Sequence, residues 1–109
     1  MLGEHLCRRL QIACTPPFRR HVFEIPLGDY IFYVEEEVPL ALVEALQTPA
    51  GREALEELRQ KLEEARGGVV AKTRGGRVVE VETEPWVDPE AARLLVYVVA
   101  ARAGWRYDS

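Results

Sequence analysis

The sequence contains a single serine, at its last position, and no asparagine. A Ser-His-Asp hydrolase needs a serine that its base can reach, and the terminal Ser109 does not meet that need, so we exclude this class. Neither a G-x-G-x-x-G motif nor a P-loop occurs, because the glycine pairs at 67–68 and 75–76 fit a helix end and a tight turn. The longest apolar run, residues 94–101, is far too short to cross a membrane.

Cysteine, histidine and lysine are also scarce, with two of each, whereas twelve arginines are present. A composition poor in thermolabile residues and rich in Glu, Arg, Ala and Leu suggests a thermophilic bacterium. Residues 1–5 lack the basic and apolar regions that open a signal peptide, so we expect a cytoplasmic protein with its cysteines not joined as a disulfide. A chain of 109 residues that is 48% hydrophobic predicts one globular domain over residues 1–109.

The spacing of apolar residues predicts an α+β fold in the order α-ββ-α-α-ββ-α. Thr48 and Pro49 are typical of a helix start, and Gly75-Gly76 is typical of a hairpin turn. The simplest arrangement is one four-stranded, mostly antiparallel sheet from two hairpins, with the helices packed on one face. We expect helices at residues 2–13, 39–47, 49–66 and 89–103, and strands at 21–25 and 29–37 and, as a second hairpin, within 69–84.

Both histidines and both cysteines lie in one short segment, at His5, Cys7, Cys14 and His21. Their spacing, H-x-C-x6-C-x6-H, fits no common zinc template. If a helix continued to Cys14, that sulfur would lie about 10 Å from Cys7 along the axis, too far for one zinc ion. We therefore expect no metal and no other cofactor, with a cysteine packing as a small apolar residue. A zinc site formed by these four residues is the alternative.

Residues 77–83, RVVEVET, resemble the (D/E)xK strand of restriction-endonuclease-like nucleases, in which carboxylates bind Mg²⁺ and a lysine assists the attacking water. Glu82 stands where that lysine is expected, and the preceding strand has no metal-binding aspartate. Glu80, Glu82 and Glu84 share one strand face, which is typical of a solvated sheet surface. An enzyme is therefore not predicted, and a metal-dependent enzyme is the third hypothesis.

The charges are unevenly distributed along the chain. Residues 1–21 contain four arginines against one glutamate, whereas residues 22–48 contain six acidic residues and no lysine or arginine. The arginines suggest an alternative function as a nucleic-acid-binding accessory domain. The acidity of the whole chain disfavours it, since the arginines can instead neutralise the acidic segment. The residues of this alternative are Arg8, Arg9, Arg19 and Arg20.

The predicted first hairpin combines aromatic rings with a run of acids. Because neighbouring strand residues point to opposite faces, Phe32 and Tyr33 cannot both pack against the helices. One ring must therefore lie exposed among carboxylates, unless Trp105 or Tyr107 of the C-terminal tail covers it. We predict a protein that works through protein–protein contacts, as a regulator or as an assembly or chaperone-like factor. Its predicted partner-binding residues are Tyr30, Phe32, Tyr33, Glu35, Glu36 and Glu37.

Residues 94–101 are apolar at every position, so a helix here is apolar on all sides. Asp88-Pro89 favours a helix over the alternative, a buried strand. A helix lying on one sheet needs only an apolar stripe, so its outer side requires further cover. We expect that cover from a second copy, in a homodimer whose interface includes Leu95, Val98 and Val99. The alternative is that the helix belongs wholly to the core.

Overall fold

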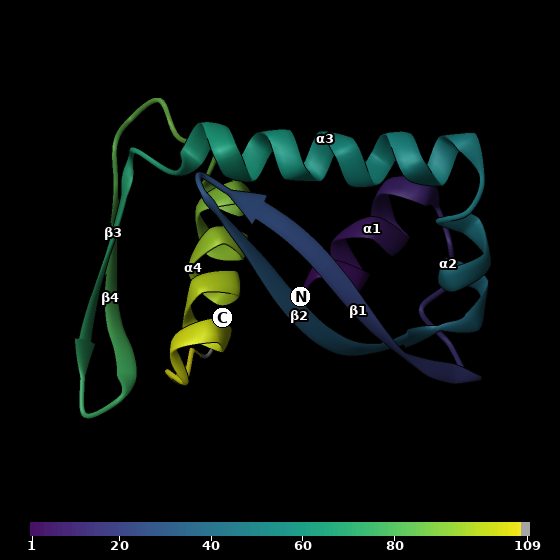
Figure 1. Ribbon diagram of the computed structural model, residues 1–109, viewed down its shortest axis with the longest axis horizontal. Helices are drawn as coiled ribbons and strands as arrows, with labels where there is room; N and C mark the ends of the chain where they lie inside the picture. The colour runs from purple at the N-terminus through teal and green to yellow at the C-terminus, as the bar shows by residue number, and fades with distance from the viewer. Residues whose placement is uncertain (108–109) are drawn as a thin grey trace.

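The structure is a computed structural model and describes residues 1–107 (Figure 1). Its elements follow the predicted order α-ββ-α-α-ββ-α, which confirms the α+β fold. In chain order they are α1 (Leu2–Leu10), β1 (Phe18–Leu27), β2 (Tyr30–Pro39), α2 (Leu40–Ala45), α3 (Pro49–Ala65), β3 (Val69–Arg74), β4 (Arg77–Thr83) and α4 (Pro89–Ala103).

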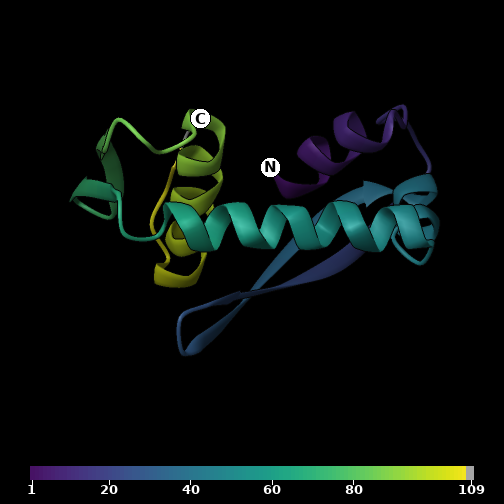
Figure 2. The same cartoon turned by 90° about the horizontal axis from the view of Figure 1, so that it is seen from above.

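The prediction of one four-stranded sheet is wrong. Strands β1 and β2 form one antiparallel pair and β3 and β4 form another, and no ladder joins the two pairs. The reason is the position of α4, which stands between the two hairpins and contacts both (Figure 1). The helices therefore do not share one sheet face. Helix α3 runs along one side of the molecule, with α1 on one flank of it and the β1–β2 hairpin on the other (Figure 2).

Helix α1 ends three residues earlier than the predicted helix over 2–13. Gln11 adopts a left-handed conformation with φ 57°, and the Ile12 amide donates to the Cys7 carbonyl oxygen at 2.8 Å. This αL ending turns the chain back towards α1. Its physical reason is apolar packing, because Ile12 lies partly buried against the core.

Helix α3 begins as its sequence predicts. The Thr48 side chain accepts a hydrogen bond from the Gly51 amide at 3.2 Å, and Pro49 occupies the first turn. Its buried residues recur at helical spacing and face the core. They are Gly51, Ala54, Leu58, Leu62 and Ala65.

Residues 94–101 lie within helix α4, so the alternative that they form a buried strand is wrong. The helix contacts α3, β2, β3 and β4, and these elements of the same chain cover most of its apolar surface. Val98 is fully buried and Leu95 is buried, while Val99 is partly buried. The argument that α4 needs a second copy for cover therefore no longer holds. The homodimer itself stays a prediction.

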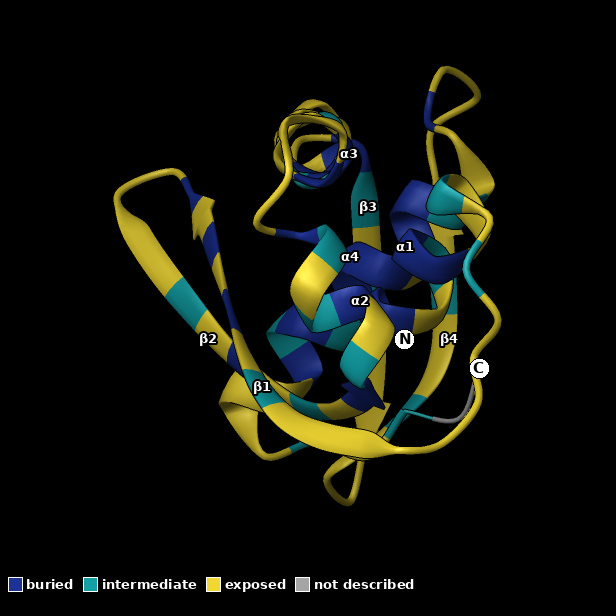
Figure 3. Cartoon of the chain, turned by 90° about the vertical axis from the view of Figure 1, so that its right-hand side faces the viewer, coloured by how far each residue is buried: buried dark blue, intermediate teal, exposed yellow. Residues whose placement is uncertain are grey.

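The first hairpin is a regular ribbon of two ten-residue strands. Its register runs from Phe18 opposite Pro39 to Leu27 opposite Tyr30, without a bulge. One face is buried and the other is exposed, as Figure 3 shows along β1 and β2. The buried face supplies Phe23, Ile25, Leu27, Val34 and Val38 to the core.

Candidate functional site

The exposed face of the first hairpin, which we call the outer face, is built from four cross-strand pairs. These pairs are Arg20–Glu37, Val22–Glu35, Glu24–Tyr33 and Pro26–Ile31. Three apolar side chains of this face are about half exposed or more: Val22 of β1 at 49%, and Ile31 and Tyr33 of β2 at 51% and 59%. Monomeric proteins normally bury large apolar side chains that cluster on one strand face.

Carboxylates border this apolar group on the outer face. Glu35 pairs with Arg20 at 3.1 Å. Glu24 and Glu37 are exposed and form no ion pair with any residue between 1 and 107. The outer face thus combines an aromatic ring, two aliphatic side chains and unneutralised negative charge, a combination that suits a partner with basic and apolar groups.

The six residues predicted to bind a partner do not share one face. Tyr33, Glu35 and Glu37 belong to the outer face, whereas Phe32 and Glu36 point inward and Tyr30 lies at the tip. Sequence reasoning missed Val22 and Ile31. Strict alternation along both strands, combined with the register of the hairpin, identifies these two residues.

The carboxylate of Glu36 is not free to bind a partner, because it is held by hydrogen bonds within the fold. It accepts hydrogen bonds from the amides of Leu2 and Gly3, each at 2.9 Å, and from the Tyr97 hydroxyl at 2.8 Å. These bonds tie β2 to the first turn of α1 and to α4. Burial, followed by the hydrogen bond to Glu36, raises the pKa of Tyr97 well above its ordinary value.

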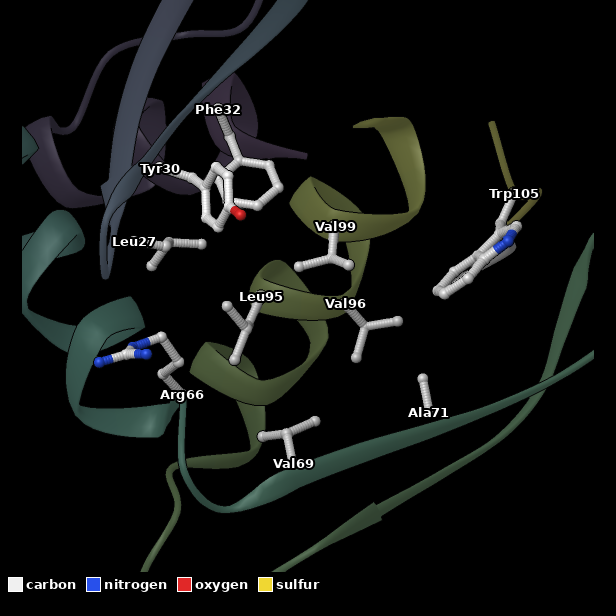
Figure 4. A pocket seen from close by; sticks show the side chains of 10 residues that line it. All are labelled: Leu27, Tyr30, Phe32, Arg66, Val69, Ala71, Leu95, Val96, Val99 and Trp105. Carbon is white, nitrogen blue, oxygen red and sulfur yellow. The ribbon is translucent and has the colours of Figure 1, made fainter. Parts of the chain in front are cut away.

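An apolar cavity of about 380 Å³ lies between the tip of the first hairpin and α4 (Figure 4). Tyr30 and Phe32 border it from β2, and Trp105 borders it from the C-terminal segment. Its size is near the lower end of small-molecule sites. Arg66 is its only charged lining residue, and that guanidinium is already paired with Glu63 at 2.9 Å. The other lining residues are Leu27, Val69, Ala71, Leu95, Val96 and Val99.

The His/Cys segment divides into separate contacts. His5 Nδ1 lies 3.0 Å from Glu90 Oε1, and the ring of His21 meets that of Phe23 edge-on at 4.7 Å. The hydrogen bond from His5 lowers the pKa of Glu90, and burial lowers the pKa of His21. Within residues 1–107, no group of three or more His, Cys, Asp or Glu side chains is placed to hold a metal ion.

The distance expected between the two cysteines along one helix is wrong. The helix does not continue to Cys14, so the expected separation of about 10 Å along one axis does not apply. Burial, and after it the influence of the Cys14 thiol, raises the pKa of Cys7 to about 11. Cys7 is buried and Cys14 is exposed, and both are free thiols.

The four N-terminal arginines are mostly neutralised. Arg8 pairs with Glu90, Arg9 with Glu57 at 3.0 Å, and Arg20 with Glu35. Arg19 is the only one of the four without an ion pair to the described residues. Since phosphate binding depends on unpaired cations, this arrangement disfavours the nucleic-acid alternative.

The carboxylates of the second hairpin lie on a solvated surface. Lys72 pairs with Glu80 at 3.5 Å and with Glu82 at 3.0 Å, and all three side chains are exposed. Glu84 follows the strand and is also exposed. An exposed lysine between two carboxylates accounts for these residues without a metal ion.

Comparison with known proteins identifies no relative of this chain. No model of a known protein family matches the chain, and no curated protein and no solved structure matches it significantly. None of the helices within residues 1–107 has both the length and the apolar character needed to cross a membrane.

Proposed function

We propose that this protein is a cytoplasmic protein-binding module, and that the outer face of the first hairpin is its recognition surface. The observation that carries the proposal is the exposure of Val22, Ile31 and Tyr33 on the same face of the β1–β2 hairpin. Such a group is characteristic of an interface core, where aromatic residues are enriched and charges are few.

The chemistry of the rim favours a basic partner over a second copy of the chain. Glu24 lies directly opposite Tyr33, and Glu37 lies one pair beyond Glu35 on the same face. An arginine of the partner can stack on the Tyr33 ring while it pairs with Glu24. Two copies meeting through this face would bring carboxylates against carboxylates, which costs free energy. The partner is therefore a protein segment in which an apolar side chain is flanked by Arg or Lys.

The experiment compares two matched surface variants. The first replaces Ile31 and Tyr33 with serine, and the second replaces Val70 and Val79, which are 58% and 57% exposed on the second hairpin, with serine. Each immobilised variant captures proteins from lysate of the native host, with and without nuclease treatment. The affinity for a captured protein is then measured by calorimetry with purified components.

We expect the Ile31/Tyr33 variant to lose roughly 10-fold or more in affinity, because truncating a central aromatic residue typically costs over 1 kcal/mol of binding. The Val70/Val79 variant should bind like the wild type. A Glu24→Lys/Glu37→Lys variant should also bind less, and high salt should reduce that difference. Equal affinities for all variants would contradict the proposal. Proteins captured only before nuclease treatment would favour the nucleic-acid alternative.

A further inference from the structure

The apolar cavity between the tip of the first hairpin and α4 is separate from the outer face. Tyr30 and Phe32 border it from β2, Trp105 borders it from the C-terminal segment, and three aliphatic residues of α4 line it as well (Figure 4). Its volume of about 380 Å³ exceeds that of one water molecule many times, and its apolar walls offer water few hydrogen-bond partners. A small organic molecule is therefore a better occupant than water.

We propose that this cavity binds a small aromatic molecule that carries one carboxylate. Three aromatic rings border the cavity, and the rest of its lining is aliphatic except for Arg66. An aromatic ligand packs against such rings by offset or edge contacts, which add to the gain from burying apolar surface. The volume is near the lower end of small-molecule sites, so a compact ligand is favoured over a large cofactor.

The charge of the ligand follows from the polar groups that the lining offers. The chain has 18 acidic residues, yet none of the ten lining residues is acidic. The Arg66 guanidinium only donates hydrogen bonds, and the hydroxyl of Tyr30, whose side chain is 68% exposed, can donate one as well. A ligand that accepts hydrogen bonds through a carboxylate complements these donors, whereas an ammonium group does not.

One edge of the Arg66 guanidinium is open to a ligand. Its Nε and Nη2 atoms both bond to Glu63 Oε1 at 2.9 Å, and Glu63 Oε2 accepts a hydrogen bond from the Gly28 amide at 3.2 Å. Nη1 forms no ion pair with the described residues, and even a Cβ atom added at Gly28 would lie 3.0 Å from it. The edge formed by Nη1 and the second Nη2 proton can therefore bind a carboxylate at the margin of the cavity.

The test titrates the full-length, ¹⁵N-labelled protein with three probes that share one apolar body. They are 2-naphthoate, the neutral 2-naphthalenemethanol and the cationic 2-naphthylmethylammonium. Two-dimensional NMR follows the two indole N–H signals. Trp105 lines the cavity, whereas Trp86 is 62% exposed at a different site and serves as the internal control.

We expect 2-naphthoate to shift the Trp105 signal in a saturable manner and to leave the Trp86 signal in place. Because Glu63 already balances the charge of Arg66, the carboxylate should add a moderate gain, roughly 10-fold over the alcohol. The ammonium probe should bind no better than the alcohol. Equal affinities for the three probes, no saturable shift, or an equal shift of Trp86 would each overturn the proposal.

Two variants separate the carboxylate contact from the apolar contact. Arg66→Gln should reduce the affinity for 2-naphthoate to that for the alcohol, while Arg52→Gln, at the other end of α3 and outside the cavity, should not. Ala71→Leu places a larger side chain in the cavity from β3 and should weaken the binding of all three probes. The Arg66 comparison does not depend on the folding of Ala71→Leu, which circular dichroism checks. An unchanged preference for 2-naphthoate in Arg66→Gln would contradict the assignment.

A second copy of the chain is the competing occupant of the cavity. If a side chain of that copy filled the cavity, the affinity for 2-naphthoate would fall as the protein concentration rises. Light scattering would then show that the probe dissociates a dimer. Either result would overturn the proposal, whereas an affinity that is independent of protein concentration, with an unchanged mass, supports it.

Discussion

At the scale of single residues, Glu36 shows how neighbouring side chains of the same type have different tasks. Three glutamates follow one another at 35–37, and strand alternation turns only the middle one inward. Its carboxylate receives three hydrogen bonds, two of them from the first turn of α1, where backbone amides have no partner within the helix. The middle glutamate therefore stabilises the fold, whereas the outer two lie on the exposed face of the hairpin.

We predict that Glu36→Ala lowers the free energy of unfolding by about 2–3 kcal/mol, because two amides and the Tyr97 hydroxyl lose a charged acceptor. Glu37→Ala is the matched control, since that exposed side chain forms no ion pair with the described residues. It should change the free energy by less than about 0.5 kcal/mol. Urea denaturation measures both, and similar losses for the two variants would contradict the role of Glu36.

Tyr97 should make stability fall at alkaline pH. Its pKa in the folded protein is raised above the ordinary value of about 10, so the folded state holds the phenolic proton more tightly than the unfolded state does. The corresponding stability is complete below about pH 10 and is lost as the pH rises above it. Tyr97→Phe removes the titrating group, so its free energy of unfolding should fall less steeply above pH 10. Identical slopes for the two proteins would refute this assignment.

At the scale of elements, the junction of α2 and α3 depends on Gly51. A Cβ atom at this position would lie 1.9 Å from the Ala45 carbonyl oxygen and 2.7 Å from the Leu46 Cα, so the two helices could not approach as they do. In an ordinary helix interior, replacing glycine with alanine stabilises by about 1 kcal/mol. Here close packing reverses that preference.

We therefore predict that Gly51→Ala destabilises the protein by about 1–3 kcal/mol. Gly67→Ala is the control, because a Cβ there meets nothing within 4 Å, and it should be neutral or stabilising by up to about 1 kcal/mol. Thermal denaturation followed by circular dichroism reports both changes. A stabilising Gly51→Ala would mean that α2 and α3 are not in this close contact.

At the scale of the whole molecule, α4 connects the two hairpins. It contacts β2 on one side and β3 and β4 on the other, and it packs against α3 as well. Its apolar stretch, residues 94–101, therefore matches a helix that is covered mostly by its own chain. Leu95 and Val98 are buried within one chain, so they cannot contact a second copy while the chain stays folded. If the protein forms a homodimer, another surface must form the interface.

The variant Val98→Glu tests whether α4 is a core helix or part of a dimer interface. Val98 is fully buried within one chain, so a carboxylate there should cost at least about 3 kcal/mol or unfold the protein. Val79→Glu, at a site that is 57% exposed, should cost less than about 0.5 kcal/mol. Light scattering and circular dichroism together provide the measurement. A Val98→Glu protein that is well folded and monomeric, beside a dimeric wild type, would place the interface on α4 after all.

Local patterns in the sequence determined the order of the elements. The cap at Thr48, the turn at Gly75-Gly76 and the apolar spacing of α3 act over a few residues, so they can be read directly from the chain. The exposed ring on the first hairpin was also predictable, because strand alternation is local. Tyr33 is that ring.

Only the tertiary structure decided which distant elements meet. The separation of the two hairpins depends on α4 lying between them, and the early end of α1 depends on a turn that packs Ile12 onto the core. The inward role of Glu36 likewise depends on α1 and α4 arriving beside β2. These features arise from packing between segments far apart in the sequence, and a pattern within one segment does not contain that information.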